Sequence, residues 1–149
     1  MGNQEPMDAI ILPVALATTA ACALLNLWLA FRVGILRRSE KISIGDGGNE
    51  RLTARMRAQL NFAEYAPIVL ILIALIELAM GTVEWLWVVA ALFVVARILH
   101  AFGMDGWKPG RAIGIVLTFL VLAGLALYAA SIPYLMTGES ETIELIQAG

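Results

Sequence analysis

The chain has 149 residues, 60% of them hydrophobic, and its mean hydropathy is +0.83. A soluble domain of this size would have too little polar surface to stay in solution, so the composition excludes a water-soluble protein and indicates an integral membrane protein. The net charge of −2 is small. The charges are nevertheless distributed very unevenly along the chain, and their positions predict the topology.

Four apolar runs, at about residues 9–31, 60–80, 85–101 and 113–135, are candidates for membrane-spanning helices. A helix of about 20 residues rises about 30 Å, which is the thickness of the hydrocarbon core. We therefore predict an all-α, antiparallel four-helix transmembrane bundle that forms a single domain over residues 1–149. Acidic residues precede the first run, where a secretory signal would be basic, so this run is interpreted as a retained span.

Most of the positive charge lies in the first connection, at about residues 32–56. Its basic residues are Arg32, Arg37, Arg38, Lys41, Arg51 and Arg55. A turn-rich stretch at residues 43–49 interrupts this connection, and a helical pattern resumes at Glu50, so the second helix should begin before the bilayer. Basic clusters beside a span set topology and contact lipid head groups, which we expect here in place of nucleic acid.

The distribution of Lys and Arg also predicts which side each connection faces. The last connection, at about residues 103–110, is basic as well, with Lys108 inside it and Arg111 directly after it. The N-terminus, the short second connection and the tail carry acids only. By the positive-inside rule the two basic connections face the cytosol and both termini face the opposite side.

The second span contains the most informative polar residues of the chain. At 100° per residue, Arg57, Asn61, Glu64 and Tyr65 fall within about a third of the helix circumference. Polar groups inside a membrane are costly and usually functional. A purely structural ion pair between Glu64 and an arginine remains an alternative. Glu77, on the opposite side of this helix, is expected to be an interface residue.

Further polar residues are expected at the same cytosolic depth. They are Arg37 and Arg38 at the end of the first helix, Arg97 and His100 near the end of the third, and Arg111 at the start of the fourth. Together with the polar face of the second span they predict a cationic pocket that contains one acid. Such a pocket favours an anionic ligand that also carries an ammonium group for Glu64. No second His or usable Cys accompanies His100, so no metal site is predicted.

The polar segment of the second span resembles the signature of the membrane-associated proteins in eicosanoid and glutathione metabolism, the MAPEG family. The matching residues are Arg57, Ala58, Gln59, Asn61, Glu64, Tyr65 and Pro67. The spacing of Arg37-Arg38, Arg97-x-x-His100 and Arg111 is similar to that of leukotriene C4 synthase and microsomal glutathione transferase. The loop at residues 45–51 resembles the bacterial branch of the family, which implies a bacterial inner membrane location.

The resemblance implies a homotrimer of four-helix subunits that binds glutathione, as co-substrate, between neighbouring subunits on the cytosolic side. The residues implied to bind glutathione are Arg37, Arg57, Gln59, Asn61, Glu64, Tyr65 and His100, with Arg97 as a structural or glutathione-binding residue. Arg111 is implied to stabilise the thiolate, and Arg38 falls where a second catalytic arginine is proposed. Met104 replaces a tyrosine that contacts glutathione in eukaryotic members, so one polar contact is missing.

The expected activity is a membrane-bound glutathione transferase that acts on a lipophilic electrophile, a detoxification reaction, with glutathione-dependent peroxidase activity as a further option. One alternative within the family is a non-catalytic, trimeric lipid-binding or scaffold protein. Another alternative is a small multidrug exporter. Such exporters use an acid in the first span, and the span at 9–31 has none.

Overall fold

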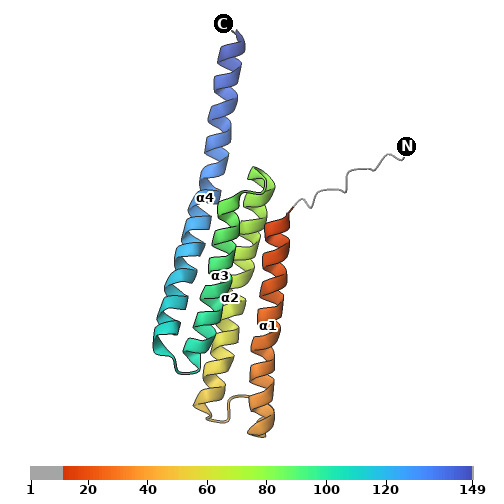
Figure 1. Ribbon diagram of the computed structural model, residues 1–149, viewed down its shortest axis with the longest axis vertical. Coiled ribbons are helices and arrows are strands. Elements are labelled where there is room, and N and C mark those ends of the chain that lie inside the picture. Colours follow the sequence, from red (N-terminus) through yellow and green to blue (C-terminus); the bar gives the residue numbers. More distant parts are fainter. Residues whose placement is uncertain (1–11, 149) are drawn as a thin grey trace, which may run out of the picture.

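The structure is a computed structural model that describes residues 12–148, with side chains from residue 12 to residue 135. It contains four long helices, which are α1 (Pro13–Ser39), α2 (Glu50–Met80), α3 (Glu84–Met104) and α4 (Lys108–Ala148), shown in Figure 1. Each of them includes a segment long and apolar enough to cross a membrane. The prediction of an all-α, four-helix membrane bundle is confirmed. Residues 9–11, where the first span was expected to begin, lie outside the described residues.

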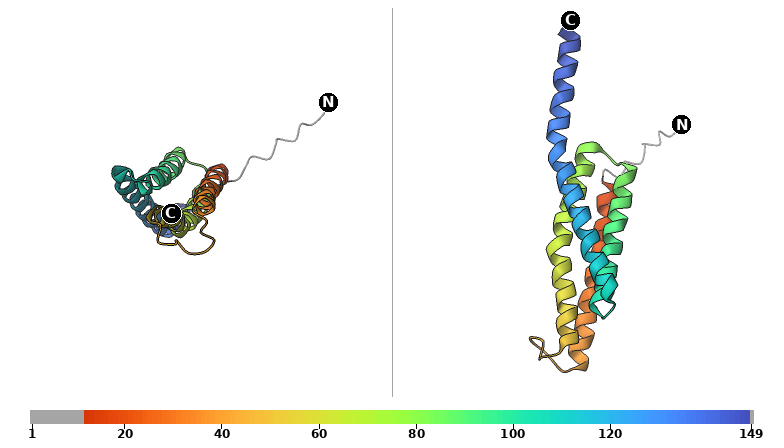
Figure 2. Two further views of the ribbon diagram at one scale, coloured as in Figure 1. Left: turned by 90° about the horizontal axis from the view of Figure 1, so that it is seen from below. Right: turned by 90° about the vertical axis from the view of Figure 1, so that its left-hand side faces the viewer.

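The helices form two antiparallel hairpins, α1–α2 and α3–α4, that pack side by side (Figure 1). Helices α2 and α3 occupy the middle of the bundle, and each contacts helices of the other hairpin. Helices α1 and α4 lie at opposite edges and do not touch within the described part of the chain, as the end-on view in Figure 2 shows. Any feature between α2 and the α3–α4 pair therefore lies between two separate hairpins.

The connection between α1 and α2 is short because both helices extend beyond the apolar runs. Within this connection, irregular backbone is confined to residues 40–49. Asn49 caps α2, since its side chain accepts a hydrogen bond from the backbone N–H of Leu52 at 3.0 Å. Such a cap satisfies one of the N–H groups that a helix start leaves without a partner. The helix thus starts at Glu50, as the sequence pattern indicated.

Glu77 caps the start of α1, and the expectation that it is an interface residue is wrong. Its side chain is buried, with 1% exposure. One carboxylate oxygen accepts from the backbone N–H of Val14 at 3.0 Å and the other from that of Ala15 at 2.8 Å. The hydroxyl of Thr82 donates to the same carboxylate at 2.9 Å. No side chain at the start of α1 forms this cap, so the neighbouring helix supplies it.

Most of the interior of the bundle is apolar, and so is much of its outer surface. The fully buried side chains include Val69, Ile73 and Phe93 from the two middle helices. Large apolar side chains such as Leu24 and Leu120 are exposed, at 70% and 63%. In water such a surface would be unstable, whereas in a bilayer it can face lipid or another membrane chain.

Candidate functional site

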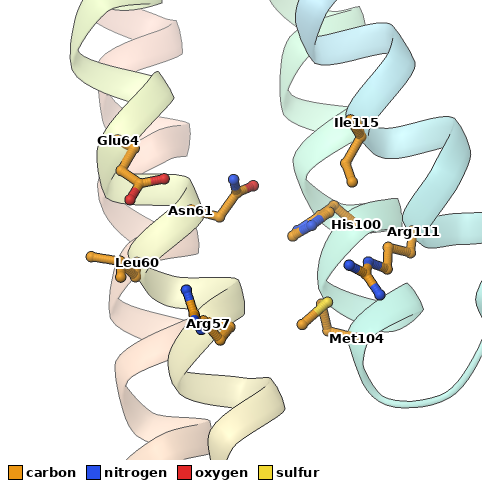
Figure 3. Close-up of a pocket in the computed structure, with 8 residues that line it drawn as sticks. All are labelled: Arg57, Leu60, Asn61, Glu64, His100, Met104, Arg111 and Ile115. Atoms are coloured by element: carbon orange, nitrogen blue, oxygen red, sulfur yellow. The ribbon is translucent and has the colours of Figure 1, made fainter.

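A polar pocket of about 370 Å³ lies between α2 on one side and α3 and α4 on the other (Figure 3). It is close to the basic end of the bundle, where the connections α1–α2 and α3–α4 lie. The pocket is lined by Arg57, Leu60, Asn61, Glu64, His100, Met104, Arg111 and Ile115. Small-molecule sites commonly measure about 300–1,000 Å³. The pocket can therefore hold a compact ligand, and its polar lining favours a charged one.

Helix α2 supplies the side of the pocket that carries both a cation and an acid. Arg57, Asn61 and Glu64 are separated by four and three residues, so they project from one face of the helix. In Figure 3 the side chain of Asn61 points across the pocket toward His100. This arrangement follows from the helical spacing alone, and it brings together three of the residues that the sequence predicted.

Helices α3 and α4 supply the opposite side, and two glycines allow them to approach closely there. A Cβ atom at Gly103 would lie 2.1 Å from the backbone nitrogen of Arg111, and one at Gly114 would lie 2.7 Å from the Cβ of His100. No larger residue fits either position without displacing backbone. The first turns of α4 are therefore held against the end of α3. As a result Arg111 lines the pocket together with Met104 and His100 (Figure 3).

Arg97 lies behind the pocket, where it is 2% exposed. Its Nη2 donates to the Oδ1 of Asn61 at 2.8 Å and lies 3.5 Å from the Nδ1 of His100. Its Nη1 donates to the hydroxyl of Thr118 at 3.3 Å, whereas its Nε has no hydrogen-bond partner within the part of the chain whose side chains are described. Arg97 thus orients the amide of Asn61 and joins α3 to α2, but it does not line the pocket.

The structural alternative for Glu64 is not observed. Glu64 forms no ion pair with Arg57 or Arg97 within the part of the chain whose side chains are described. Its side chain is exposed and lines the pocket. The carboxylate is therefore free to hold a cationic group of a ligand.

Two further residues of the predicted site, Arg37 and Gln59, lie away from this pocket. They line a second hollow of about 790 Å³ between α1 and α2, which also includes Arg57. Arg37 is half-buried, and its Nη1 donates to the carbonyl oxygen of Gly45 at 2.7 Å. One chain by itself therefore does not bring Arg37 and Gln59 together with Arg111.

Tyr65 and Arg38 lie beside these hollows without lining either of them. The ring of Tyr65 contacts that of Phe119 in an edge-on arrangement, with the ring centroids 5.5 Å apart. This contact joins α2 to α4 one turn beyond the pocket. Arg38 is exposed in the last turn of α1. A direct role for Arg38 thus requires a ligand or a neighbouring chain at that surface.

Comparison with known proteins identifies the family. The MAPEG family model matches residues 15–131. The chain therefore belongs to the MAPEG family. It is also similar to the inner membrane protein YecN of Escherichia coli (strain K12) and of Escherichia coli O6:H1. Each is 32% identical over an alignment of 110 residues, and the match covers 69% of this chain and 83% of the relative. The resemblance seen in the sequence is thus confirmed, and the MAPEG match covers every residue of the pocket.

Sequence reasoning missed Asp105, which connects the two hairpins of this MAPEG chain. Its carboxylate pairs with the Nη2 of Arg32 on α1, and its other oxygen accepts from the Nε of Arg55 on α2 at 3.1 Å. The Nη1 of Arg55 also donates to the backbone carbonyl of Arg32 at 3.1 Å. One signal was available, because Asp105 is the only acid in the basic connection at residues 103–110.

Proposed function

We propose that the protein is a membrane-bound glutathione transferase that joins the sulfur of glutathione to a lipophilic electrophile. The observation that supports this best is the lining of the pocket, where Arg57 and Glu64 on α2 lie opposite Arg111, and Glu64 has no ion-pair partner within residues 12–135. Glutathione carries carboxylates, one ammonium group and a thiol. Arginine binds carboxylates as a fork, and a carboxylate holds an ammonium group. The pocket offers both kinds of partner within one small volume.

In this proposal Arg111 stabilises the thiolate of bound glutathione. A thiol of pKa ~8.5 is about 3% ionised at pH 7, so complete ionisation increases the nucleophile about 30-fold. The thiolate then attacks the electrophilic carbon and forms a carbon–sulfur bond. With an aryl chloride, for example, chloride leaves with the electron pair of the broken bond. Any further acceleration comes from holding the thiolate and the electrophile together.

We also propose that a homotrimer completes the site. Arg37 and Gln59 lie on the opposite side of α2 from Arg111. A neighbouring subunit can add such residues to the pocket, together with Arg38 as a second catalytic arginine. The exposed apolar side chains of the outer helix faces support an assembly within the bilayer. In this arrangement Arg97 acts from behind the site through Asn61.

The proposed location is a bacterial inner membrane, with the glutathione site facing the cytosol and both termini in the periplasm. The relatives are named inner membrane proteins. The Lys and Arg residues gather in and beside the two connections at the pocket end of the bundle, whereas Glu77 and Glu84 lie at the other end. The positive-inside rule places basic connections on the cytosolic side.

The role of Arg111 is tested by Arg111→Ala, with Lys108→Ala as the matched control. Lys108 carries the same charge one turn earlier on α4 and does not line the pocket. With chlorodinitrobenzene as electrophile in detergent, Arg111→Ala should lower kcat by up to about 30-fold at pH 7 because the thiolate is lost. Glutathione binding should remain. Equal turnover of the two variants would remove Arg111 from the chemistry.

The role of Glu64 is tested by Glu64→Gln, with Glu84→Gln as the control at the far end of the bundle. Losing a charged hydrogen bond to the ammonium group should cost about 1.5–3 kcal/mol of binding, roughly 10- to 150-fold in Kd. Calorimetry with glutathione measures this loss. Equal affinity of the variant and the wild type would show that Glu64 does not hold the ammonium group of glutathione. Tight glutathione binding with no turnover of any electrophile would instead favour the non-catalytic member of the family.

A further inference from the structure

The pocket is divided between two hairpins, so its width depends on what holds the hairpins together. Arg57, Asn61 and Glu64 belong to α1–α2, whereas His100 and Arg111 belong to α3–α4. Within residues 12–135, side-chain hydrogen bonds cross between the hairpins at two places only. One is the bond from Arg97 to Asn61 at the deep end of the pocket. The other lies at the loop end, where Asp105 bonds to Arg32 and Arg55, three residues that we call the Asp105 group.

The Asp105 group is well packed for a cluster so close to the loops. Arg32 is 8% exposed, and its guanidinium lies 4.5 Å from the centre of the Trp28 ring. The Trp28 ring in turn contacts that of Phe102, with the centroids 5.6 Å apart. Removal from water strengthens an ion pair and makes an unpaired member costly. Because the Nη1 of Arg32 is buried and has no hydrogen-bond partner among the described residues, Asp105 is the group that holds this cation in place.

Asp105 is also linked directly to the position of Arg111. It follows Met104 at the end of α3, and the neighbouring Gly103 packs against the backbone of Arg111 so closely that a Cβ there would lie 2.1 Å from the backbone nitrogen. On the other side of the pocket, Arg55 precedes Arg57 by two residues. The Asp105 group therefore joins the start of α4, which carries Arg111, to the part of α2 that carries Arg57.

We infer that Asp105 is a positioning residue, which fixes the spacing between Arg111 and the α2 side of the pocket through Arg32 and Arg55. It does not line the pocket and is not a catalytic residue. The consequence for sulfur chemistry rests on the proposed function, whereas the consequence for hairpin spacing does not. Loosening the spacing should weaken thiolate stabilisation by Arg111. Glutathione affinity should change less, because the α2 residues remain in place.

The first measurement is the distance between the hairpins without glutathione. Spin labels at Arg51→Cys on α2 and Ile113→Cys on α4, both exposed positions, report it in a Cys22→Ala background, since Cys22 is the single cysteine. Labelled chains are diluted into unlabelled ones so that one pair is read per assembly. Asp105→Asn should broaden the distance distribution. An unchanged distribution would overturn the inference whatever the protein does with glutathione.

The control variant is Asp46→Asn. Asp46 is also a carboxylate in a basic-end connection, but its bonds to Gly48 and Thr53 stay within the α1–α2 hairpin. This variant loses the same charge and should leave the distance distribution unchanged. If Asp105→Asn does not fold, Arg55→Gln breaks one arm of the group and leaves the Arg32–Asp105 pair intact. That variant should also broaden the distribution, and an unchanged distribution for it would equally overturn the inference.

The second measurement is the ionisation of the bound thiol, followed by the ultraviolet absorbance of the thiolate against pH. If the wild type holds the thiol pKa near ~6.5, a rise of one unit lowers the thiolate fraction at pH 7 from about 76% to about 24%, a threefold loss. Asp105→Asn should therefore reduce kcat about threefold with a smaller change in KM for glutathione. A purely structural loss would reduce the amount of folded protein without moving the thiol pKa, and that result would also overturn the inference. A broadened distribution in a protein that binds no glutathione would refute the proposed function and leave the spacing role standing.

Discussion

Glu77→Gln should destabilise the bundle although it lies far from the pocket. The wild-type carboxylate accepts hydrogen bonds from the backbone N–H groups of Val14 and Ala15 and from the hydroxyl of Thr82. Glutamine has one acceptor oxygen, so its NH₂ group must face one of these backbone N–H donors. Losing one charged hydrogen bond and the favourable charge at a helix start together cost about 2–4 kcal/mol.

A loss of this size is measurable as thermal stability in detergent. For a chain of about 150 residues, 1 kcal/mol corresponds to about 2–4 °C in Tm, so we expect a decrease of roughly 5–15 °C. Glu84→Gln is the matched control, because Glu84 is exposed at the first position of α3 and makes only the weak interaction of an acid with a helix start. Its Tm should fall by much less, in line with about 0.3–1 kcal/mol.

The result that would refute this reasoning is an equal Tm for the two variants. Glutathione binding offers a second check. Glu77 lies 13 residues after Glu64 along α2, about 20 Å at 1.5 Å per residue. The folded fraction of Glu77→Gln should therefore bind glutathione with wild-type affinity in calorimetry. A loss of affinity in this fraction would mean that the two ends of α2 are coupled.

Two further predictions concern α4 and the first connection. Gly114→Ala should cost about 1–3 kcal/mol, because the new Cβ would lie 2.6 Å from the carbonyl oxygen of Ala96, whereas Gly124→Ala, with open space at the Cβ, should raise Tm slightly. Equal Tm values for the two would contradict the close helix approach. The hydrogen bond from the Gly48 N–H holds the pKa of Asp46 below its usual value. This bond stabilises the loop fully when the pH is above the unfolded-state pKa of about 3.9, and it is lost as the pH falls through the lower folded-state pKa of Asp46. Hydrogen exchange at Gly48 in the wild type, corrected for its intrinsic pH dependence, should therefore increase over that low-pH range. Asp46→Asn should abolish that pH dependence, and an unchanged profile would refute the assignment.

The sequence was sufficient for features that depend on local periodicity. Arg57, Asn61 and Glu64 share a helix face because of their spacing, so their convergence could be predicted without any tertiary information. The depth of His100 and Arg111 followed from the ends of apolar runs. The sequence could not predict the rotation of α3 about its own axis. The bond between Arg97 and Asn61 depends on this rotation, and nothing in the local pattern encodes it.

Glu77 and Asp105 show the same limit for charges. Each looks in the sequence like an acid close to a membrane interface, and its depth alone suggests exposure to head groups. Their partners are separated from them by 63 and 73 residues, respectively. Both acids bond to another helix, so their roles follow from which helices are neighbours. A single sequence contains that information only through the complete fold.

The surroundings of Arg97 bear most directly on the chemistry of the pocket. A buried cation in a membrane span is costly, and a carboxylate partner would reduce that cost. Here the guanidinium instead bonds to an amide and a hydroxyl, those of Asn61 and Thr118. Neutral partners hold the side chain in place but leave its charge uncancelled, and in a medium of low dielectric constant that charge acts over several ångströms. The positive potential of the pocket therefore comes from Arg97 as well as from Arg57 and Arg111. A carboxylate in place of Asn61 would fix the same geometry but remove that contribution, so an amide at this position suits the anionic ligand proposed for the pocket.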